Sequence, residues 1–556
     1  MSISRRSFLT ISTAVGLSGL YGAYAHVTDA VLTTASIRNG ENLTDLGPIL
    51  PPKNAREIAD RWLPSQPWAA HAAYQLRTAD GKSYVYYESW ERTDSDMAVR
   101  LKPFALVWMP DGQDPDEEPI RIISDSAYFR FTSEFSLTGG SPGRVTAGSL
   151  EGNVRILGND GLDVVGKNFV FSESAMRVYS DDHVKFTHGL NHGHALGLQI
   201  ELIRDTTTDP NDAMAVAGFK SVQLRRNVVM DLMLGEKLPA DQEKPGQPRA
   251  DAKQPTPVTV TSAGSFTFNT QTNIATFEKD VHVLKPVESN GHDTLQCDKL
   301  TLFFEPDKRA KQDVAKKTAA KESALTSDGA EREFQGIDDN LTFRRLQADG
   351  KDVVLTSGVN KMRAHMGKLE YDAQSRVAVL TGEKPVRVLQ ETNELTAPKV
   401  TFVHDAAGSV DSANCSGPGQ LKYHDPQTGE IQLHAKWIKE LRKYSEPKSE
   451  LEIIELEQQA VVRQPGEKSE LAAEFIKLWI EPQDKPDGAA SSKTGSDSAA
   501  DPANRVSIDR LHALKKVTMT NPDMIAKTDE LQVWFEDADL PPQVSEQNAG
   551  TPSGNG

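Results

Sequence analysis

One short unit of sequence recurs from about residue 145 to the end of the chain, and it restricts the possible folds more than any other feature. Each copy ends in a strand with the pattern small-x-x-apolar-x-apolar-aromatic. The clearest copies lie at 297–306, 473–482 and 528–537, and looser ones lie at 166–172 and 397–405. A tandem unit of this kind predicts a stacked or rolled architecture instead of independent catalytic domains.

A second strand precedes each copy by roughly a dozen residues and carries a charged or polar kink followed by Val-x-apolar. These kinked strands lie at 150–156, 277–283, 380–388, 456–463 and 514–519. Upstream, alternating strands are predicted at 84–90, 98–108, 120–123 and 127–131, after a short helix at 54–62. No convincing helix is predicted beyond residue 144.

Alternation along these strands places apolar side chains on one face and a mixed set on the other. Strands with one apolar face are expected to roll up and hide that face. The sequence therefore predicts an all-β fold, an elongated antiparallel β-jelly roll built from tandem repeats. The residues expected on the inward apolar face are Leu300, Leu302, Phe304, Ile476, Leu478, Leu531 and Val533. They either line an open trough or fill a closed core.

Composition excludes some functions. The net charge is −17 with dispersed basic residues, which disfavours nucleic acid as a partner because phosphate binding needs clustered Lys and Arg. Cys297 and Cys415 are too few for a disulfide framework or a four-cysteine zinc site. They are expected to be small buried thiols, and the alternative is a single disulfide bridge between them.

The N-terminus has the features of an export signal. Two arginines, Arg5 and Arg6, precede an uncharged segment from Phe8 to Tyr24, and Ala23-Tyr24-Ala25 has the pattern of a cleavage site. The same segment is long enough to remain as a membrane anchor. Both outcomes, anchoring and cleavage after Ala25, place the body of the protein outside the cytoplasm.

Composition also suggests where the chain divides. The expected parts are listed in order: 1–30 signal or anchor, 31–73 linker with a short helix, 74–235 N-terminal jelly roll, 236–257 linker, 258–482 repeats with an insertion at 307–333, 483–504 disordered insertion, 505–537 last repeat and 538–556 disordered tail.

The paired strand pattern at 259–306, 366–405 and 450–537 resembles the LptA/OstA-like family of lipopolysaccharide transport. The N-terminal anchor with a β-rich body resembles the related LptC proteins. This resemblance implies a V-shaped jelly roll whose interior binds lipid acyl chains. It also implies a non-enzymatic bridge protein of the periplasm, which joins other jelly rolls by edge-strand addition and takes part in outer-membrane biogenesis. The expected partners are lipopolysaccharide or a similar amphiphile, other bridge proteins and the inner membrane.

Two other functions remain open at this stage. The chain could be an exported structural or adhesive β-solenoid with a filled core and no lipid cargo. It could also be a right-handed β-helix acting on polysaccharide, although such a fold would show more regular rungs and a stack of Asp or His.

Few residues suggest chemistry. His183, His188, His192 and His194 lie close together, and His192 and His194 are weak candidates for metal ligands, with a polar hairpin as the simpler interpretation. The pair Asp181-Asp182 occupies a kink, as charged pairs do in other copies, and no catalytic residue or cofactor is predicted. Four tryptophans on strands serve either packing or sugar stacking: Trp90, Trp108, Trp479 and Trp534.

Overall fold

The computed structural model describes residues 2–3, 54–77, 83–95, 97–109, 118–132, 145–158, 161–204, 216–234, 236–237, 256–287, 291–306, 341–358, 361–405, 410–425, 428–446, 449, 451–480 and 508–535. They belong to two compact units, Met1–Glu383 and Lys384–Gly556, and each is described by itself. The predicted signal segment, most of the 236–257 linker and the insertions at 307–333 and 483–504 lie outside the described residues, as does the tail at 538–556.

The first unit contains the helices α2 (Ala55–Trp62) and η1 (Ala69–His71). Its strands are β1 (Ser2–Ile3), β2 (Tyr74–Arg77), β3 (Ser83–Thr93), β4 (Ala98–Trp108), β5 (Ile120–Phe131), β6 (Val145–Leu157), β7 (Asp163–Ser172), β8 (Arg177–His188), β9 (Asn191–Arg204), β10 (Val216–Leu234), β11 (Glu236–Lys237), β12 (Thr256–Ser262), β13 (Phe266–Asn269), β14 (Ile274–Val287), β15 (Gly291–Pro306), β16 (Leu341–Ser357) and β17 (Met362–Asp372). Strand β18 (Val377–Gln390) contains the boundary between the units.

The second unit continues with strands of the same kind. They are β19 (Asn393–His404), β20 (Val410–Ser416), β21 (Gly419–His424), β22 (Ile431–Trp437), β23 (Glu440–Ser445), β24 (Glu452–Gln464), β25 (Ser469–Ile480), β26 (Ile508–Thr520) and β27 (Ile525–Trp534).

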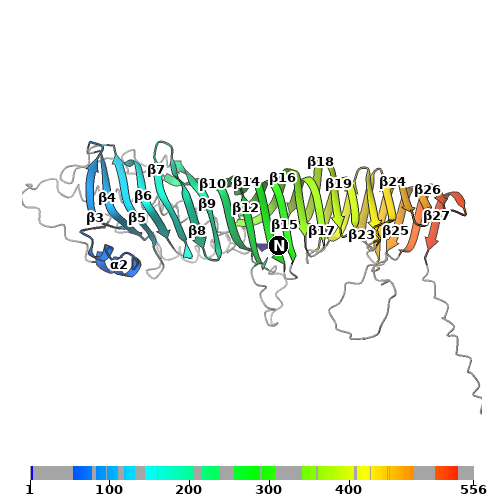
Figure 1. Cartoon of the computed structure of the whole chain (residues 1–556), viewed down its shortest axis with the longest axis horizontal. Helices are drawn as coiled ribbons and strands as arrows, with labels where there is room; N and C mark the ends of the chain where they lie inside the picture. The colour runs from blue at the N-terminus through cyan, green and yellow to red at the C-terminus, as the bar shows by residue number, and fades with distance from the viewer. Residues whose placement is uncertain are drawn as a thin grey trace, which may run out of the picture. The chain divides into compact units, whose positions relative to one another are not determined.

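Both units are antiparallel meanders. In the first, each strand from β2 to β10 pairs with the next, as Figure 1 shows for β3 to β10. Strand β10 then pairs with β12 and β13, both pair with β14, and β15 to β17 follow in turn. In the second unit, β19 pairs with β20 and β21, and the two lines of strands rejoin at β24 before β25, β26 and β27. The predicted all-β antiparallel fold is confirmed.

The long strands bend near their middle at β-bulges. Register shifts occur after Leu150, Glu278, Glu457 and Leu514, which are all within predicted kinked strands. Lys279 and Asp280 take positive φ angles at one bulge, and the pairs Gln458-Gln459 and Lys515-Lys516 do so at two others. A bulge bends the strand and puts successive residues on the solvent side, which explains why polar residues occupy these positions.

Each bend divides its strand into two halves that form the two layers of the roll. The rings of Phe104 and Phe129 meet edge to face at a centroid distance of 6.0 Å. Phe104 is paired with Ser124 on one side of the β5 bulge, whereas Phe129 lies beyond that bulge. This contact therefore joins the two layers. The sequence pattern had predicted two strands where β5 is one bulged strand.

Helix α2 matches the predicted helix at 54–62 and covers the outer face of the first strands of its unit (Figure 1). Its buried residues Ala55 and Ala59 pack with Tyr84 and Tyr86. The Tyr86 hydroxyl donates a hydrogen bond to the Ala55 carbonyl oxygen at 2.7 Å. Because α2 covers one face and the roll the other, strand β3 is buried on both faces between Tyr84 and Tyr87.

Substituting Gly419 by alanine tests the packing of the second unit. A Cβ there would lie 2.2 Å from Cζ2 of Trp437, whose side chain is fully buried. We expect Gly419→Ala to destabilise this unit by about 1–3 kcal/mol, measured by thermal or denaturant unfolding, because overpacked cores must shift. Gly466→Ala is the matched control, since nothing lies within 4 Å of its added Cβ. Trp437→Leu should relieve part of the loss in the double variant, and strictly additive losses would contradict the contact.

Candidate functional site

The interior of the first unit is lined by one apolar row that crosses its strands in register. It runs from β4 to β17 through paired positions: Val99, Phe129, Gly148, Phe171, Val178, Ile200, Val222, Phe268, Ala275, Leu302, Leu346 and Tyr371. All are buried except the last three, which are half-buried. At about 4.8 Å per strand, the row extends for roughly 50 Å.

The other half of each bent strand carries a matching row. It runs from β2 to β17 through Leu76, Val85, Leu106, Ile122, Ile156, Val164, Phe186, Gly193, Met230, Val260, Val283, Leu295, Leu355 and Ala364. Neither row contains a charged residue. Both layers of the roll therefore present a continuous hydrocarbon surface to the interior.

The predicted inward residues of the first unit fall on this surface. Leu300 and Phe304 are buried, and Leu302 is half-buried. Leu300 continues a parallel row in which Phe277, Ala348 and Leu369 are its successive neighbours. That these side chains line a space for a ligand, instead of filling a closed core, stays a prediction.

The second unit has an equivalent row, which brings together residues from β19 to β27. Its members are Val400, Cys415, Leu441, Leu456, Ile476, Ala513 and Leu531. Ile476 and its neighbour Leu478 are buried, whereas Leu531 and Val533 on β27 are half-buried. The predicted residues of this unit therefore share one face, and their side chains become more exposed from β25 to β27.

Strand β27 is an edge of the second unit, because among the described residues it pairs with β26 alone. Two of its large apolar side chains are exposed, Ile525 at 70% and Trp534 at 64%. Met524 and Phe535, which flank the strand, are also exposed. An unpaired strand edge that carries apolar residues is suited to strand addition by another chain.

Both cysteines are free, buried thiols, as the sequence predicted. Desolvation by burial raises the pKa of Cys297 and of Cys415 from 9.0 to about 12 each. The thiolate is the reactive form, so at about pH 8 we expect both to react with Ellman's reagent about a thousandfold more slowly in the folded protein than in the denatured protein. Rapid labelling of the folded protein would show that its interior is open to a polar reagent.

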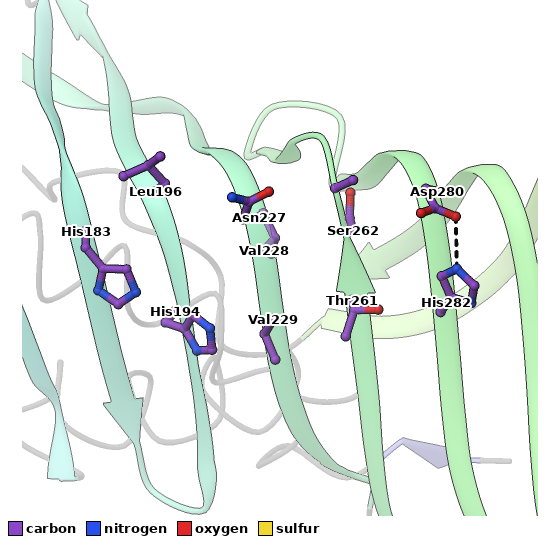
Figure 2. Close-up of a pocket in the computed structure, with 11 residues that line it drawn as sticks. His183, His194, Leu196, Asn227, Val228, Val229, Thr261, Ser262, Asp280 and His282 are labelled. Carbon is purple, nitrogen blue, oxygen red and sulfur yellow. Dashed lines mark hydrogen bonds and ion pairs between the residues drawn. The ribbon is translucent and has the colours of Figure 1, made fainter.

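A pocket of about 490 Å³ lies on the first unit, and Figure 2 shows the residues that line it. Its side chains on β9, β10, β12 and β14 alternate with those of the apolar row, so it lies on the outward face of these strands. Four of its residues lie side by side on adjacent strands: His194 on β9 pairs with Val229 on β10, Val229 pairs with Thr261 on β12, and Thr261 pairs with His282 on β14. His183 joins His194 at one end, where the two rings stack at a centroid distance of 5.4 Å. At the other end His282 Nε2 lies 2.9 Å from Asp280 Oδ1.

The two ends of this pocket differ in charge. Beside His183 stand His194 and Lys185, and desolvation together with these two neighbours lowers the pKa of His183 from 6.5. Among the described residues, neither His183, His194 nor Lys185 forms an ion pair with a carboxylate. The far end instead holds the carboxylate of Asp280. In the sequence, His183 and His194 belong to a cluster with His188 and His192, of which His192 and His194 were the weak metal candidates. His282 lies nearly ninety residues beyond His194, and only the pairing of β10 and β12 with their neighbours brings it to the same face.

The metal site considered for His192 and His194 gains no support. His192 Nε2 contacts Asp231 Oδ2 at 3.1 Å instead. Within the described residues, no group of three or more His, Cys, Asp or Glu side chains is placed to hold a metal ion. The pair Asp181-Asp182 lies at a bulge, where Asp181 pairs with Arg225 and Asp182 accepts a hydrogen bond from Asn168.

The tryptophans differ in their environment. Trp479 lies between Lys477 and Arg510, whose charged groups stand 4.9 and 4.4 Å from its ring centroid, and its indole N–H donates to Glu446. Trp90 and Trp108 are half-buried, which also fits packing. The predicted membrane anchor lies outside the described residues, and no described helix has the length and apolar character needed to span a membrane.

Strand pairing and burial thus define the class of protein: an all-β antiparallel roll with an apolar interior. A search of solved structures finds similarity to LptH, described as the LptA-homologous periplasmic component of the lipopolysaccharide transport device of Pseudomonas aeruginosa. The match is 20% identical and covers 26% of this chain and 99% of LptH, with a TM-score of 0.18. No protein-family profile and no curated protein matches the chain.

Proposed function

We propose that this protein is a non-enzymatic lipid-binding protein that holds the acyl chains of a lipopolysaccharide-like amphiphile in the interior of its β-rolls. The observation that carries the proposal is the charge-free apolar row, which continues in register from β4 to β17 for roughly 50 Å. Burial of each methylene contributes about 0.8 kcal/mol, so a long acyl chain is held best by a long apolar surface.

The edge at β27 supports the second part of the proposal, that the protein joins another β-roll by strand addition. Its apolar row ends in the half-buried Leu531 and Val533 on an unpaired described edge. A partner strand added there would extend both the sheet and the apolar surface. This arrangement fits a bridge that passes an amphiphile along its interior, in the periplasm and tethered to the inner membrane by the N-terminal segment.

Photocrosslinking tests lipid binding at the inward face. A photoreactive phenylalanine at position 478 or 533 is expected to form adducts with a radiolabelled diacyl amphiphile. Positions 477 and 532 are the matched controls, because they are the preceding residues on the same strands and face the opposite side. Equal labelling at inward and outward positions, or none at either inward position, would favour the alternative of a structural β-solenoid with a filled core.

Location is tested by cell fractionation of the expressed full-length protein. Sequencing the mature N-terminus distinguishes a protein cleaved after Ala25 from one that retains its anchor. We expect an intact N-terminus and recovery with the inner membrane. Recovery of the whole protein in the cytoplasm would contradict the periplasmic assignment.

A further inference from the structure

The histidine-lined pocket on the outward face of the first unit is separate from the apolar interior. Its side chains, His194, Val229, Thr261 and His282, alternate along their strands with the buried Gly193, Met230, Val260 and half-buried Val283. A volume of about 490 Å³ falls within the usual range of small-molecule sites. The pocket can therefore bind a ligand independently of whatever occupies the interior.

One end of the pocket is suited to an anion. Figure 2 shows His183 and His194 together at this end, where their rings stack. Lys185 is in register with His194 on the neighbouring strand, which adds a third nitrogen-bearing side chain beside the pocket. No carboxylate of the described residues neutralises them by an ion pair. Imidazolium and ammonium groups form charge-assisted hydrogen bonds with phosphate oxygens.

The opposite end is suited to hydroxyl groups. Thr261 presents a hydroxyl, and the His282–Asp280 pair offers an imidazole and a carboxylate, which together can donate to and accept from a polyol. His194 and His282 are separated by three strand spacings, or roughly 14 Å. The short aliphatic side chain of Val229 forms the floor between them. An elongated ligand with an anion at one end and hydroxyls at the other matches this distribution.

We propose that this pocket binds a disaccharide phosphate, with the phosphate held by His183, His194 and Lys185 and the sugar hydroxyls directed to Thr261, Asp280 and His282. This inference goes beyond the proposed function, because it concerns the outward face. The phosphate could belong to a soluble saccharide or to the headgroup of an amphiphile, and both share the same recognition chemistry.

The proposal predicts tighter binding at lower pH. Protonation of His183 adds positive charge beside the phosphate, and because desolvation and its neighbours lower its pKa from 6.5, affinity should rise as the pH falls from about 7 to about 5. The other charged or titratable groups on this face and the strands beside it include Lys167 on β7, Asp182 and Lys185 on β8, His192 on β9, Arg226 and Asp231 on β10, and Lys279, Asp280 and His282 on β14. Asp231 is engaged by His192 and Asp280 by His282, which leaves the His183 end as the pH-dependent one.

Isothermal titration calorimetry of the full chain tests this with trehalose 6-phosphate, trehalose and inorganic phosphate. We expect trehalose 6-phosphate to bind best, and replacement of both His183 and His194 by Asn to weaken it on the order of tenfold or more and to remove the pH dependence. His365→Ala is the matched control, because His365 is on the outward face of the same unit, paired with Asp352, and lies outside the pocket. That control should bind normally.

Phosphatidylcholine vesicles with or without phosphatidylinositol 4-phosphate distinguish the two sources of the phosphate. Binding to the phosphoinositide vesicles, lost in the Asn variant, would assign the pocket to a headgroup. Equal binding of inorganic phosphate would overturn the sugar part of the proposal. Absence of binding to both trehalose 6-phosphate and phosphoinositide vesicles, or binding unchanged in the Asn variant, would overturn the site altogether. None of these outcomes depends on acyl-chain binding in the interior.

Discussion

Replacing Ile476 by glutamate is expected to prevent the second unit from folding stably. The side chain is 0% exposed, and its neighbours in register, Leu456 and Ala513, are equally buried. A carboxylate there would have no partner, and we expect a loss of more than about 4 kcal/mol, because unpaired buried charges are among the most destabilising substitutions. Thermal unfolding and limited proteolysis of the second unit measure the effect.

The matched control adds the same charge on the other face. Gln532 on β27 is exposed and donates a hydrogen bond to Glu530, so Gln532→Glu should cost no more than about 1 kcal/mol. If Ile476→Glu were as stable as the control, position 476 would be open to water, and the apolar interior described for this unit would be wrong.

Replacing Phe277 by alanine should destabilise the first unit by about 3–5 kcal/mol, because the loss of a large buried side chain leaves a cavity. Phe277 is buried in the row that contains Leu300, and its ring lies 4.8 Å from the ring of Phe266, centroid to centroid. Denaturant unfolding followed by tryptophan fluorescence measures the change in stability.

Glu278→Ala is the control for this substitution. Glu278 is the next residue on the strand and forms an exposed pair with Lys299, which contributes at most about 1 kcal/mol. Similar losses from the two substitutions would contradict the assignment of Phe277 to the core and Glu278 to the surface.

The alternating pattern predicted most of the strands and several of their buried residues. In 300–304 and 476–480, apolar residues recur at every second position, and burial follows that period for Leu300, Phe304, Ile476 and Leu478. The positions of the bulges could also be predicted from the polar kinks, because a bulge needs residues that tolerate solvent and positive φ, as Lys279 and Asp280 do. Local sequence therefore determines these features.

Contacts between distant segments could not be predicted in the same way. Trp437 packs against Gly419, and His282 shares a pocket with His183, but no local period relates these positions. Such pairs depend on the register of the intervening strands. A shift of one residue in any of them would move its side chains to the opposite face of the sheet. The packing of α2 on Tyr84 and Tyr86 is a further case, since the helix was predicted but the face it covers was not.

Native mass spectrometry of the purified exported protein tests the central claim most directly. After incubation with a diacyl amphiphile, or as isolated, the protein should carry an additional mass that matches an acylated lipid. The Phe277→Ala and Glu278→Ala proteins provide a comparison of a core variant and a surface variant for retention of that mass. A protein that stays at its bare polypeptide mass under both conditions would contradict an acyl-binding interior and leave a β-roll closed around its own side chains.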